Sequence, residues 1–283
     1  MAQGSATVGT YYNRTRRSRS IPAKLWRERR WHLLPVYYLL LTSDLAREGI
    51  AHSGSARFAD HLYRNQPSGR WGVGYLLDAL LLRLKSARAF RFRYQSACVE
   101  IRRLLQSPYA SGTPREVLAV PCGYARELFE TAKLLRAGQL PGLSALRGYG
   151  FDLDGDLIAE LQSRSRAPAL PLEFWVGDAL LSSAYRQQYD MIISMGFTEF
   201  LNDEQALEFY GVARRALKPG GILVTSGMQP HRFSEYLMRQ FAELTAHYRS
   251  AGELEALTRQ AGLSVARTYQ DPTGLQTMLV ATS

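Results

Sequence analysis

The segment from Tyr189 to Met228 constrains the fold more than any other part of the chain. An apolar strand that ends in small residues, Asp190 to Gly196, leads through an acidic turn into a helix. The helix is predicted to stop at the sequence Lys-Pro-Gly-Gly (218–221), because proline cannot continue it and glycine permits a tight turn. A second apolar strand, Ile222 to Thr225, follows. This order is typical of a parallel sheet with crossover helices.

Strands and helices alternate regularly beyond Pro114. Such alternation predicts an α/β fold with a doubly wound parallel sheet, whose ligand lies at the carboxyl ends of the strands. The last two strands are separated by a turn with Pro272 and Gly274, so we expect them to form an antiparallel hairpin. The predicted strands are 116–120, 147–151, 173–176, 190–196, 222–225, 263–269 and 276–281, and the predicted helices after the first strand include 126–136, 155–162, 232–245 and 253–261.

The part of the chain before this alternation divides into a basic, disordered arm (1–20) and a helical cap or substrate region (21–110), which leaves 114–283 for the α/β domain. Helices are predicted at 33–47, 55–64, 75–84 and 87–105, with breaks at 48–49, 67–69 and 85–86. The apolar run Leu33 to Leu41 is much shorter than the roughly 20 residues needed to span a bilayer, so no transmembrane segment is expected.

The formal charge of +10 is uneven, because eight basic residues and one acidic residue in the first 30 positions account for +7. A basic arm can attract an acidic carrier protein, anionic lipid or nucleic acid, although it can equally be a solvated leader. Cys98 and Cys122 form no ligand cluster with each other or with histidine, so no metal site is predicted. A chain with two such cysteines is expected in the reducing cytoplasm.

Acidic or small residues follow four predicted strands, and their order resembles that of class I S-adenosylmethionine-dependent methyltransferases. The loop after the first strand keeps only Gly123 of the glycines usual in that family, and Ala119 stands where the family has an acidic residue. Asp152 ends the second strand, and Asp178 follows the third. The Lys-Pro-Gly-Gly joint and the final hairpin also resemble this family. The resemblance implies a Rossmann-like, seven-stranded methyltransferase sheet.

The resemblance further implies that S-adenosylmethionine is the cofactor. Asp152 would accept hydrogen bonds from both ribose hydroxyls, although it could instead cap the following helix, a role open to Asp154. Asp178 would accept the adenine amino group, unless it only shapes a turn. The expected cofactor-binding residues are Gly123, Tyr124, Asp152, Leu153, Asp178, Ala179, Ser194, Met195 and Gly196.

The acceptor is harder to predict. After the fourth strand stands Ser194-Met195-Gly196-Phe197, without the Asn/Asp-Pro-Pro-Tyr/Phe sequence of base and glutamine methylases, so nucleic acid is not expected as the substrate. The segments 196–200 and 225–231 resemble a bacterial group of small-molecule or lipid-linked methyltransferases. Arg30-Trp31-His32 and residues 45–50 resemble the bacterial enzymes that methylate 3-hydroxy fatty acids to make methyl ester quorum-sensing signals. A carboxylate acceptor is ionised at neutral pH, and an apolar helical region could hold its acyl chain. The expected substrate-contacting residues are Tyr38, Arg57, His61 and Phe197, with Arg70 as another carboxylate partner.

Glu199 and His231 are the candidate catalytic bases if the acceptor must lose a proton, since both follow strand ends. The alternative roles are an anchor or helix cap for Glu199 and an ordinary helix residue for His231. Two other functions stay open, an RNA or protein methyltransferase that uses the basic arm and a degenerate cofactor-binding regulatory module. A homodimer is also compatible with the sequence.

Overall fold

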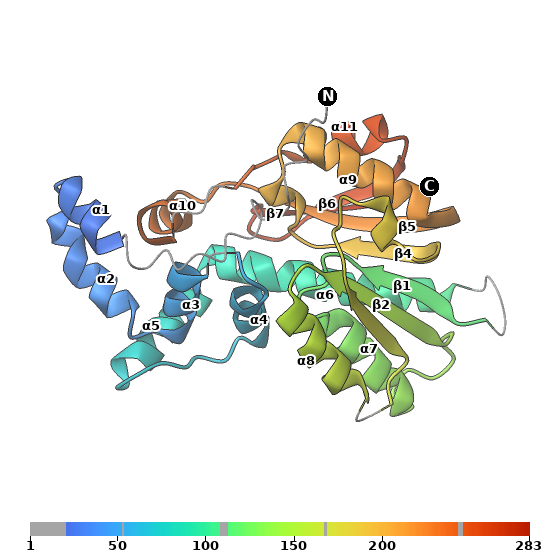
Figure 1. Ribbon diagram of the computed structural model, residues 1–283, viewed down its shortest axis with the longest axis horizontal. Helices are drawn as coiled ribbons and strands as arrows, with labels where there is room; N and C mark the ends of the chain where they lie inside the picture. Colours follow the sequence, from blue (N-terminus) through green and yellow to red (C-terminus); the bar gives the residue numbers. More distant parts are fainter. Residues whose placement is uncertain (1–20, 53, 108–112, 167–168, 243–245) are drawn as a thin grey trace. The chain divides into compact units, whose positions relative to one another are not determined.

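The computed structural model describes residues 21–52, 54–107, 113–166, 169–242 and 246–283, which form two compact units (Figure 1). The N-terminal unit contains the residues up to Arg91 together with Pro230–Ala246, and the sheet unit contains Phe92–Gln229 and His247–Ser283. The predicted limits, 21–110 and 114–283, follow breaks in the sequence. The tertiary contacts instead divide the chain inside the long helix 85–106, and they assign residues 230–246 to the N-terminal unit. The predicted arm, residues 1–20, lies outside the described residues.

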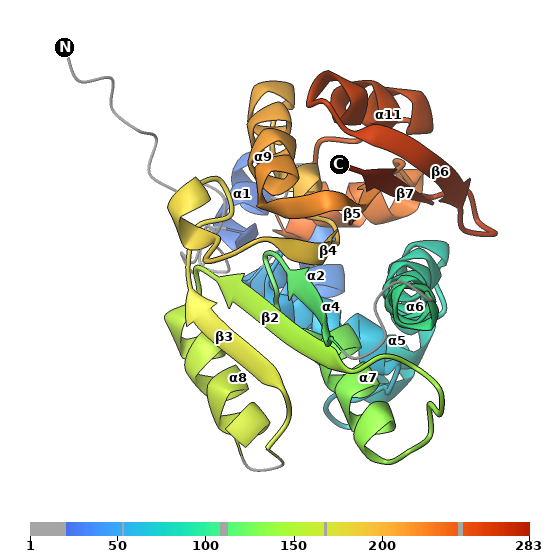
Figure 2. The ribbon, with the colours of Figure 1, turned by 90° about the vertical axis from the view of Figure 1, so that its right-hand side faces the viewer.

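The sheet unit is built on seven strands in the order β3-β2-β1-β4-β5-β7-β6 (Figure 2). Neighbouring strands from β3 to β5 are parallel, and β7 runs antiparallel between β5 and β6. The predicted α/β sheet and its closing hairpin are therefore confirmed. The strands are β1 (Arg115–Ala119), β2 (Leu146–Asp152), β3 (Leu172–Val176), β4 (Tyr189–Ser194), β5 (Leu217–Met228), β6 (Ser264–Gln270) and β7 (Gln276–Thr282).

The start of β5 differs from the prediction because pairing begins before the two glycines. Leu217 pairs with Tyr189, and the register between β4 and β5 then shifts before Ile222. Gly220 has a φ of +73°, and a Cβ on Gly221 would lie 2.8 Å from the carbonyl oxygen of Lys218. The glycines therefore form an irregularity inside the strand, where Gly220 has a φ that favours glycine and Gly221 has no room for a Cβ.

Helices flank the sheet along both of its halves. Helices α7 (Arg126–Arg136) and α8 (Gly155–Arg166) pack against β2 and β3 (Figure 2). Helices α9 (Asp203–Ala216) and α11 (Ala251–Gln260) contact each other and the β5–β7 half. A capping box at Asn202 begins α9, since the Asn202 side chain accepts the Gln205 N–H and the Gln205 side chain accepts the Asn202 N–H.

The N-terminal unit is helical, as the periodicity predicts, but the boundaries of its helices differ from the predicted ones. Its core contains Ile21, Tyr37, Ile50 and Phe241, from four different helices. The ring of Tyr37 stacks on that of Phe241, 6.4 Å between centroids. Among the described residues, no helix is both long and apolar enough to cross a bilayer. The elements are α1 (Ile21–Arg27), a 3₁₀ turn (Trp31–Leu33), α2 (Leu34–Leu40), α3 (Asp44–Ala51), α4 (Ala56–Arg64), α5 (Val73–Leu82), the start of α6 (Lys85–Gln106), α10 (Arg232–Leu237) and a π turn (Met238–Ala242).

The prediction of one helix over 33–47 with a break at 48–49 is wrong. The chain breaks earlier, at residues 41–43, because the side chain of Ser43 accepts the Ala46 N–H and so begins a new helix. Helix α3 continues through Gly49, where a Cβ would lie 3.0 Å from the ring of Phe58 on α4. Gly49 therefore serves close helix packing and does not end the helix.

Two further boundaries also move. Helix α5 ends at Leu82 and α6 begins at Lys85, so the break falls just before the predicted 85–86. The helix predicted over 232–245 is α-helical only to Leu237 and then widens into the π turn. The hydroxyls of Ser86 and Ser234 lie 2.8 Å apart, which joins the beginnings of α6 and α10.

Candidate cofactor site and its buried ion pair

The carboxylate of Asp152 links two loops at the end of β2. One oxygen accepts the Gly123 N–H at 3.2 Å, and the other accepts the Asp154 N–H at 3.1 Å. Asp154, in turn, caps α8, since its Oδ1 accepts the N–H groups of Asp156 and Leu157. Capping therefore belongs to Asp154. Burial raises the pKa of the Asp152 carboxyl.

The loop after β1 is pressed against β2. Gly123 and Ala125 have φ values of +46° and +45°, and the Val120–Pro121 peptide bond is cis. The N–H of Cys122 donates to Phe151 at 2.9 Å, and a Cβ on Gly150 would lie 2.8 Å from the Cβ of Cys122. Cys122 is thus a small residue that fits closely between the strands. Tyr124 leaves the loop toward α8, where its hydroxyl donates to Glu160 at 3.1 Å.

The loop after β3 meets the same carboxyl end of the sheet. The N–H of Gly177 donates to the carbonyl of Asp152 at 3.0 Å. Asp178 Oδ1 accepts the Leu180 N–H at 3.0 Å, so Asp178 does shape a turn, the alternative considered for it. Ala179 is buried, and its carbonyl accepts the Tyr185 hydroxyl. Leu153, between Asp152 and Asp154, is partly exposed.

The end of β4 carries a buried hydroxyl without a partner. Ser194 is fully buried, and its Oγ has no hydrogen-bond partner within the described part of the chain. Met195 is partly exposed beside it, and the N–H of Gly196 donates to Ser226 Oγ at 3.0 Å. Because buried hydroxyls are nearly always satisfied, the unpaired Ser194 Oγ suits a site that takes a polar ligand.

A buried arginine that the sequence analysis did not select lies behind Gly196. Arg93, on α6, is 4% exposed, and its Nη1 lies 3.3 Å from Glu199 Oε1. Gly196 has a φ of +77°, and a Cβ there would lie only 2.1 Å from Arg93 Nη1. Arg93 and the buried Glu100 are seven positions apart on one face of α6. Charged residues on the otherwise apolar face of a long helix are the sequence signal that could have indicated buried charges at Arg93 and Glu100.

Both candidate bases have structural contacts. Burial raises the pKa of the Glu199 carboxyl, which the Arg93 guanidinium opposes, and Glu199 is held as an ion-paired anchor. His231 is the N-cap of α10, where its Nδ1 accepts the Ser234 N–H. Phe197 is buried edge-on against Phe209, with ring centroids 5.1 Å apart, so its ring contributes to the core. Glu199 belongs to the sheet unit and His231 to the N-terminal unit.

The other substrate candidates lie in the N-terminal unit. Tyr38, Arg57 and Arg70 are exposed. His61 is instead mostly buried, with Nε2 3.1 Å from Asp78 Oδ2. Asp78 also accepts hydrogen bonds from the Ser43 hydroxyl and from two backbone N–H groups. Burial alone would raise the pKa of the Asp78 carboxyl, but its hydrogen bonds bring that pKa below the ordinary value.

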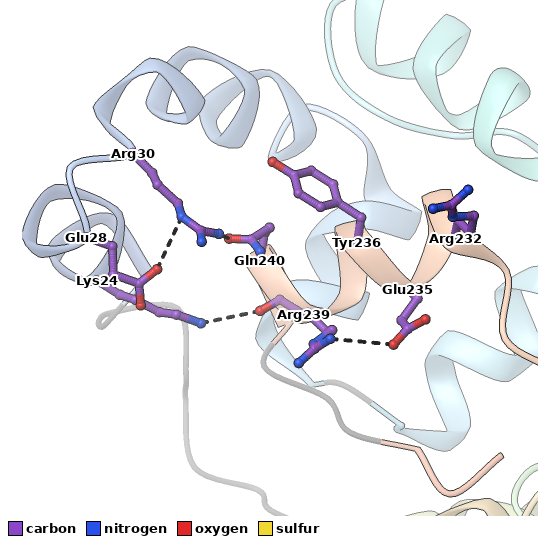
Figure 3. A pocket seen from close by; sticks show the side chains of 8 residues that line it. All are labelled: Lys24, Glu28, Arg30, Arg232, Glu235, Tyr236, Arg239 and Gln240. Carbon is purple, nitrogen blue, oxygen red and sulfur yellow. Dashed lines mark hydrogen bonds and ion pairs between the residues drawn. The ribbon is translucent and has the colours of Figure 1, made fainter.

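A hollow of about 610 Å³ lies between α1 and α10 within the N-terminal unit (Figure 3). Its cations are largely engaged with neighbours. Lys24 Nζ donates to the Arg239 carbonyl, Arg30 Nη1 donates to Gln240 Oε1 at 2.6 Å, and Arg239 lies 3.7 Å from Glu235. We assign no ligand to this hollow. The lining residues are Lys24, Glu28, Arg30, Arg232, Glu235, Tyr236, Arg239 and Gln240.

Comparisons with known proteins agree with the fold of the sheet unit. The model of a family described as “Putative methyltransferase” matches residues 16–283. The uncharacterized protein YnbC of Escherichia coli is 27% identical over 247 residues, which cover 81% of this chain and 40% of YnbC. The chain therefore spans about two fifths of the length of this curated relative.

Two solved structures share the fold. A possible exported protein from Bordetella parapertussis has a TM-score of 0.73 at 21% identity, with 94% of each chain covered. Magnesium protoporphyrin IX methyltransferase from Synechocystis, solved with bound SAH, has a TM-score of 0.54 at 15% identity and covers 79% of this chain and 93% of its own. Since the family model matches nearly the whole sequence, the chain belongs to this methyltransferase family and has the class I S-adenosylmethionine-dependent methyltransferase fold.

Proposed function

We propose that the protein methylates a carboxylate oxygen of a small amphipathic molecule, such as a 3-hydroxy fatty acid, with S-adenosylmethionine as the methyl donor. The product would be a methyl ester of the quorum-sensing type. The observation that carries the choice of methyl donor is the buried Asp152 carboxylate at the end of β2, held between the loops that follow β1 and β2. A fixed carboxylate at this position suits recognition of a ribose.

The residues around Asp152 fit this cofactor. Asp152 would accept the ribose hydroxyls, Asp178 the adenine amino group, and the backbone at Gly123 would approach the methionine part. Tyr124, Leu153 and Ala179 would line the same site, with Ser194, Met195 and Gly196 beside the sulfonium. Bound S-adenosylmethionine would supply an electrophilic methyl group. Ala119 cannot hold the cofactor's ammonium group as an acidic residue would, so backbone carbonyl groups are proposed to take that role.

The first test is the affinity for S-adenosylmethionine in Asp152→Asn and Asp152→Ala variants. Losing a charged acceptor for hydroxyl groups is expected to cost about 1.5 to 3 kcal/mol, an affinity loss of tenfold or more. Calorimetric titration measures it. Asp154→Ala is the matched control, because it removes the cap of α8 and should lower stability by about 1 kcal/mol with little change in affinity. Unchanged affinity in both Asp152 variants would contradict this placement.

The state of the two candidate bases supports an acceptor that arrives already charged. Glu199 is engaged by Arg93, and His231 accepts the N–H of Ser234, so neither presents an unoccupied base. A carboxylate needs none, because it is ionised at neutral pH. The protein would then act by orienting the acceptor and excluding water from it. We propose that Tyr38 contacts the acyl chain of the acceptor and that Arg57 contacts its carboxylate.

The product distinguishes this acceptor from others. With labelled cofactor and a panel of 3-hydroxy acids, phenols and RNA, we expect label in a methyl ester that alkali saponifies. Glu199→Gln should retain most of the activity, provided that the variant is folded. Label in an alkali-stable ether, amine or RNA base, with none in the acids, would rule out the carboxylate.

The same labelled cofactor and substrate panel distinguish two alternative functions. A regulatory module would bind S-adenosylmethionine without turnover. The departures from the family pattern would explain this, since Ala119 stands in place of an acidic residue and Pro121 in place of a glycine. An RNA or protein methyltransferase that uses the basic arm would bind RNA tightly and with steep salt dependence. A cytoplasmic location, an acidic carrier protein as a binding partner and a homodimer are further parts of the proposal.

A further inference from the structure

The net positive charge of the chain lies in residues 1–91, which are about its N-terminal third. Residues 21–91 and 230–246, which belong to the N-terminal unit, carry fourteen Lys and Arg against seven Asp and Glu, a net charge of +7. Residues 92–229 and 247–283, the sheet unit, carry seventeen against eighteen, a net charge of −1. An anionic surface would therefore be attracted to the N-terminal unit and hardly at all to the sheet unit.

The same unit exposes a continuous apolar stripe on α5. Val73, Leu76 and Leu80 are 52%, 64% and 61% exposed and lie on one face of the helix. The opposite face, with Asp78 and Leu82, is buried. Outside the N-terminal unit, the exposed large hydrophobic residues among those described are only Val99, Val176 and Leu181. The apolar exposure is thus a property of the unit that also carries the positive charge.

A tryptophan extends this stripe at the start of α5. The ring of Trp71 is 82% exposed, and its backbone has a φ of +55°, which a bulky residue rarely adopts. The chain turns tightly here because its backbone lies close to that of Thr42. A Cβ on Gly74 would lie 2.1 Å from the Thr42 carbonyl oxygen. The turn therefore holds an aromatic ring in solvent at the end of an apolar helix face, where burial would be expected.

The border of the stripe is basic and not acidic. The exposed Arg70 precedes it and the exposed Arg83 follows it, and neither contacts a carboxylate in the described part of the chain. The single acidic residue of α5, Asp78, points inward to Ser43 and His61. A helix with leucine on its exposed face, preceded by an exposed tryptophan and flanked by arginines, matches the chemistry of a bilayer interface.

We propose that the N-terminal unit docks on an anionic membrane surface through the docking stripe, defined as Trp71, Val73, Leu76 and Leu80, with Arg70 and Arg83 on lipid head groups. Helix α5 would lie in the plane of the interface, along about 15 Å of its length. A second copy of the chain is the less suitable occupant, because two units of charge +7 repel each other. The proposal does not depend on methyl transfer.

The test is flotation of the full chain with vesicles of phosphatidylcholine alone or of equal parts phosphatidylcholine and phosphatidylglycerol. We expect binding to the anionic vesicles and at least about tenfold weaker binding for Leu76→Glu/Leu80→Glu. Leu76→Lys/Leu80→Lys should also lose binding, although it adds positive charge, because its side chains cannot enter the acyl region. Val99→Glu, on the exposed surface of the sheet unit, is the matched control and should bind like the wild type.

Arg70→Gln/Arg83→Gln should weaken binding to anionic vesicles by about tenfold or more, at roughly 1 kcal/mol for each charge, and leave binding to neutral vesicles unchanged. Circular dichroism confirms that each variant is folded. Three results would overturn the proposal: no wild-type binding to anionic vesicles, full binding by the lysine variant, or a wild-type dimer in solution that the glutamate variant dissociates. The last result would assign the stripe to a second copy.

Discussion

Replacing Gly196 with alanine is expected to lower the free energy of unfolding by about 3 to 5 kcal/mol, because the new Cβ displaces a buried guanidinium from its carboxylate. A Cβ at this position would lie 2.1 Å from Arg93 Nη1, and Arg93 is the ion-pair partner of the buried Glu199. The φ of +77° adds strain of about 1 kcal/mol for any residue with a side chain. Urea denaturation measures the loss through a lower midpoint at a constant slope.

Gly220→Ala is the matched control for this substitution. Gly220 has a φ of +73°, nearly that of Gly196, but no atom lies within 4 Å of the place that a Cβ would take there. It should therefore lose only the strain, about 1 kcal/mol. If the two alanine variants were equally destabilised, contact with Arg93 would have no energetic importance.

Arg93→Met is expected to cost a similar amount, about 3 to 5 kcal/mol, because it leaves Glu199 buried without its positive partner. Arg103→Met, on the same helix, is the control. The Arg103 side chain is 56% exposed where it pairs with Glu100, and the loss of an exposed cation of this kind is expected to cost about 1 kcal/mol or less. Thermal or urea unfolding of the two variants gives the comparison.

The Arg93→Met deficit should also depend on pH. Burial already raises the pKa of Glu199, and removing Arg93 removes the main influence that lowers it. A carboxyl group with a higher pKa in the folded state holds more protons there, so its contribution is complete below the unfolded pKa and is lost as pH rises through the folded pKa. The deficit should thus be smaller near about pH 5 than near about pH 8.

A second substitution checks the cause of this pH dependence. Glu199→Gln in the Arg93→Met background replaces the buried carboxylate that has lost its ion-pair partner with a neutral amide, so it should recover part of the lost stability at the higher pH. An equal deficit at both pH values, with no recovery in the double variant, would show that Arg93 acts through packing alone.

Local chemistry accounts for most of the secondary structure of the sheet unit. The apolar strands, the alternation and the Lys-Pro-Gly-Gly joint depend on neighbouring residues, so the seven strands and the antiparallel hairpin could be predicted. The helical region was harder, because Gly49 looks like a helix end in the sequence. Its missing side chain instead allows α3 to approach Phe58 on α4, a contact between residues that sequence spacing does not reveal.

The candidate site also combines residues that the sequence predicts with contacts that only folding produces. Strand ends locate Asp152, Asp178 and Ser194, because the carboxyl ends of parallel strands meet along one edge of a sheet. The choice between Asp152 and Asp154 as the cap of α8 required the hydrogen bonds. Arg93 stands about 100 residues before Glu199 in the sequence, and only folding brings these two charges together.

By itself, then, the sequence determined the order of the elements, the type of sheet and the positions of the polar residues at the strand ends, since these depend on short-range sterics and on hydrophobic periodicity. The tertiary structure decided which charges are buried, as with Arg93 and Asp78, and which apolar residues stay exposed, as with Leu76 and Leu80. Burial is a property of contacts between distant segments, so the role of a charge or a leucine emerges only when those segments pack.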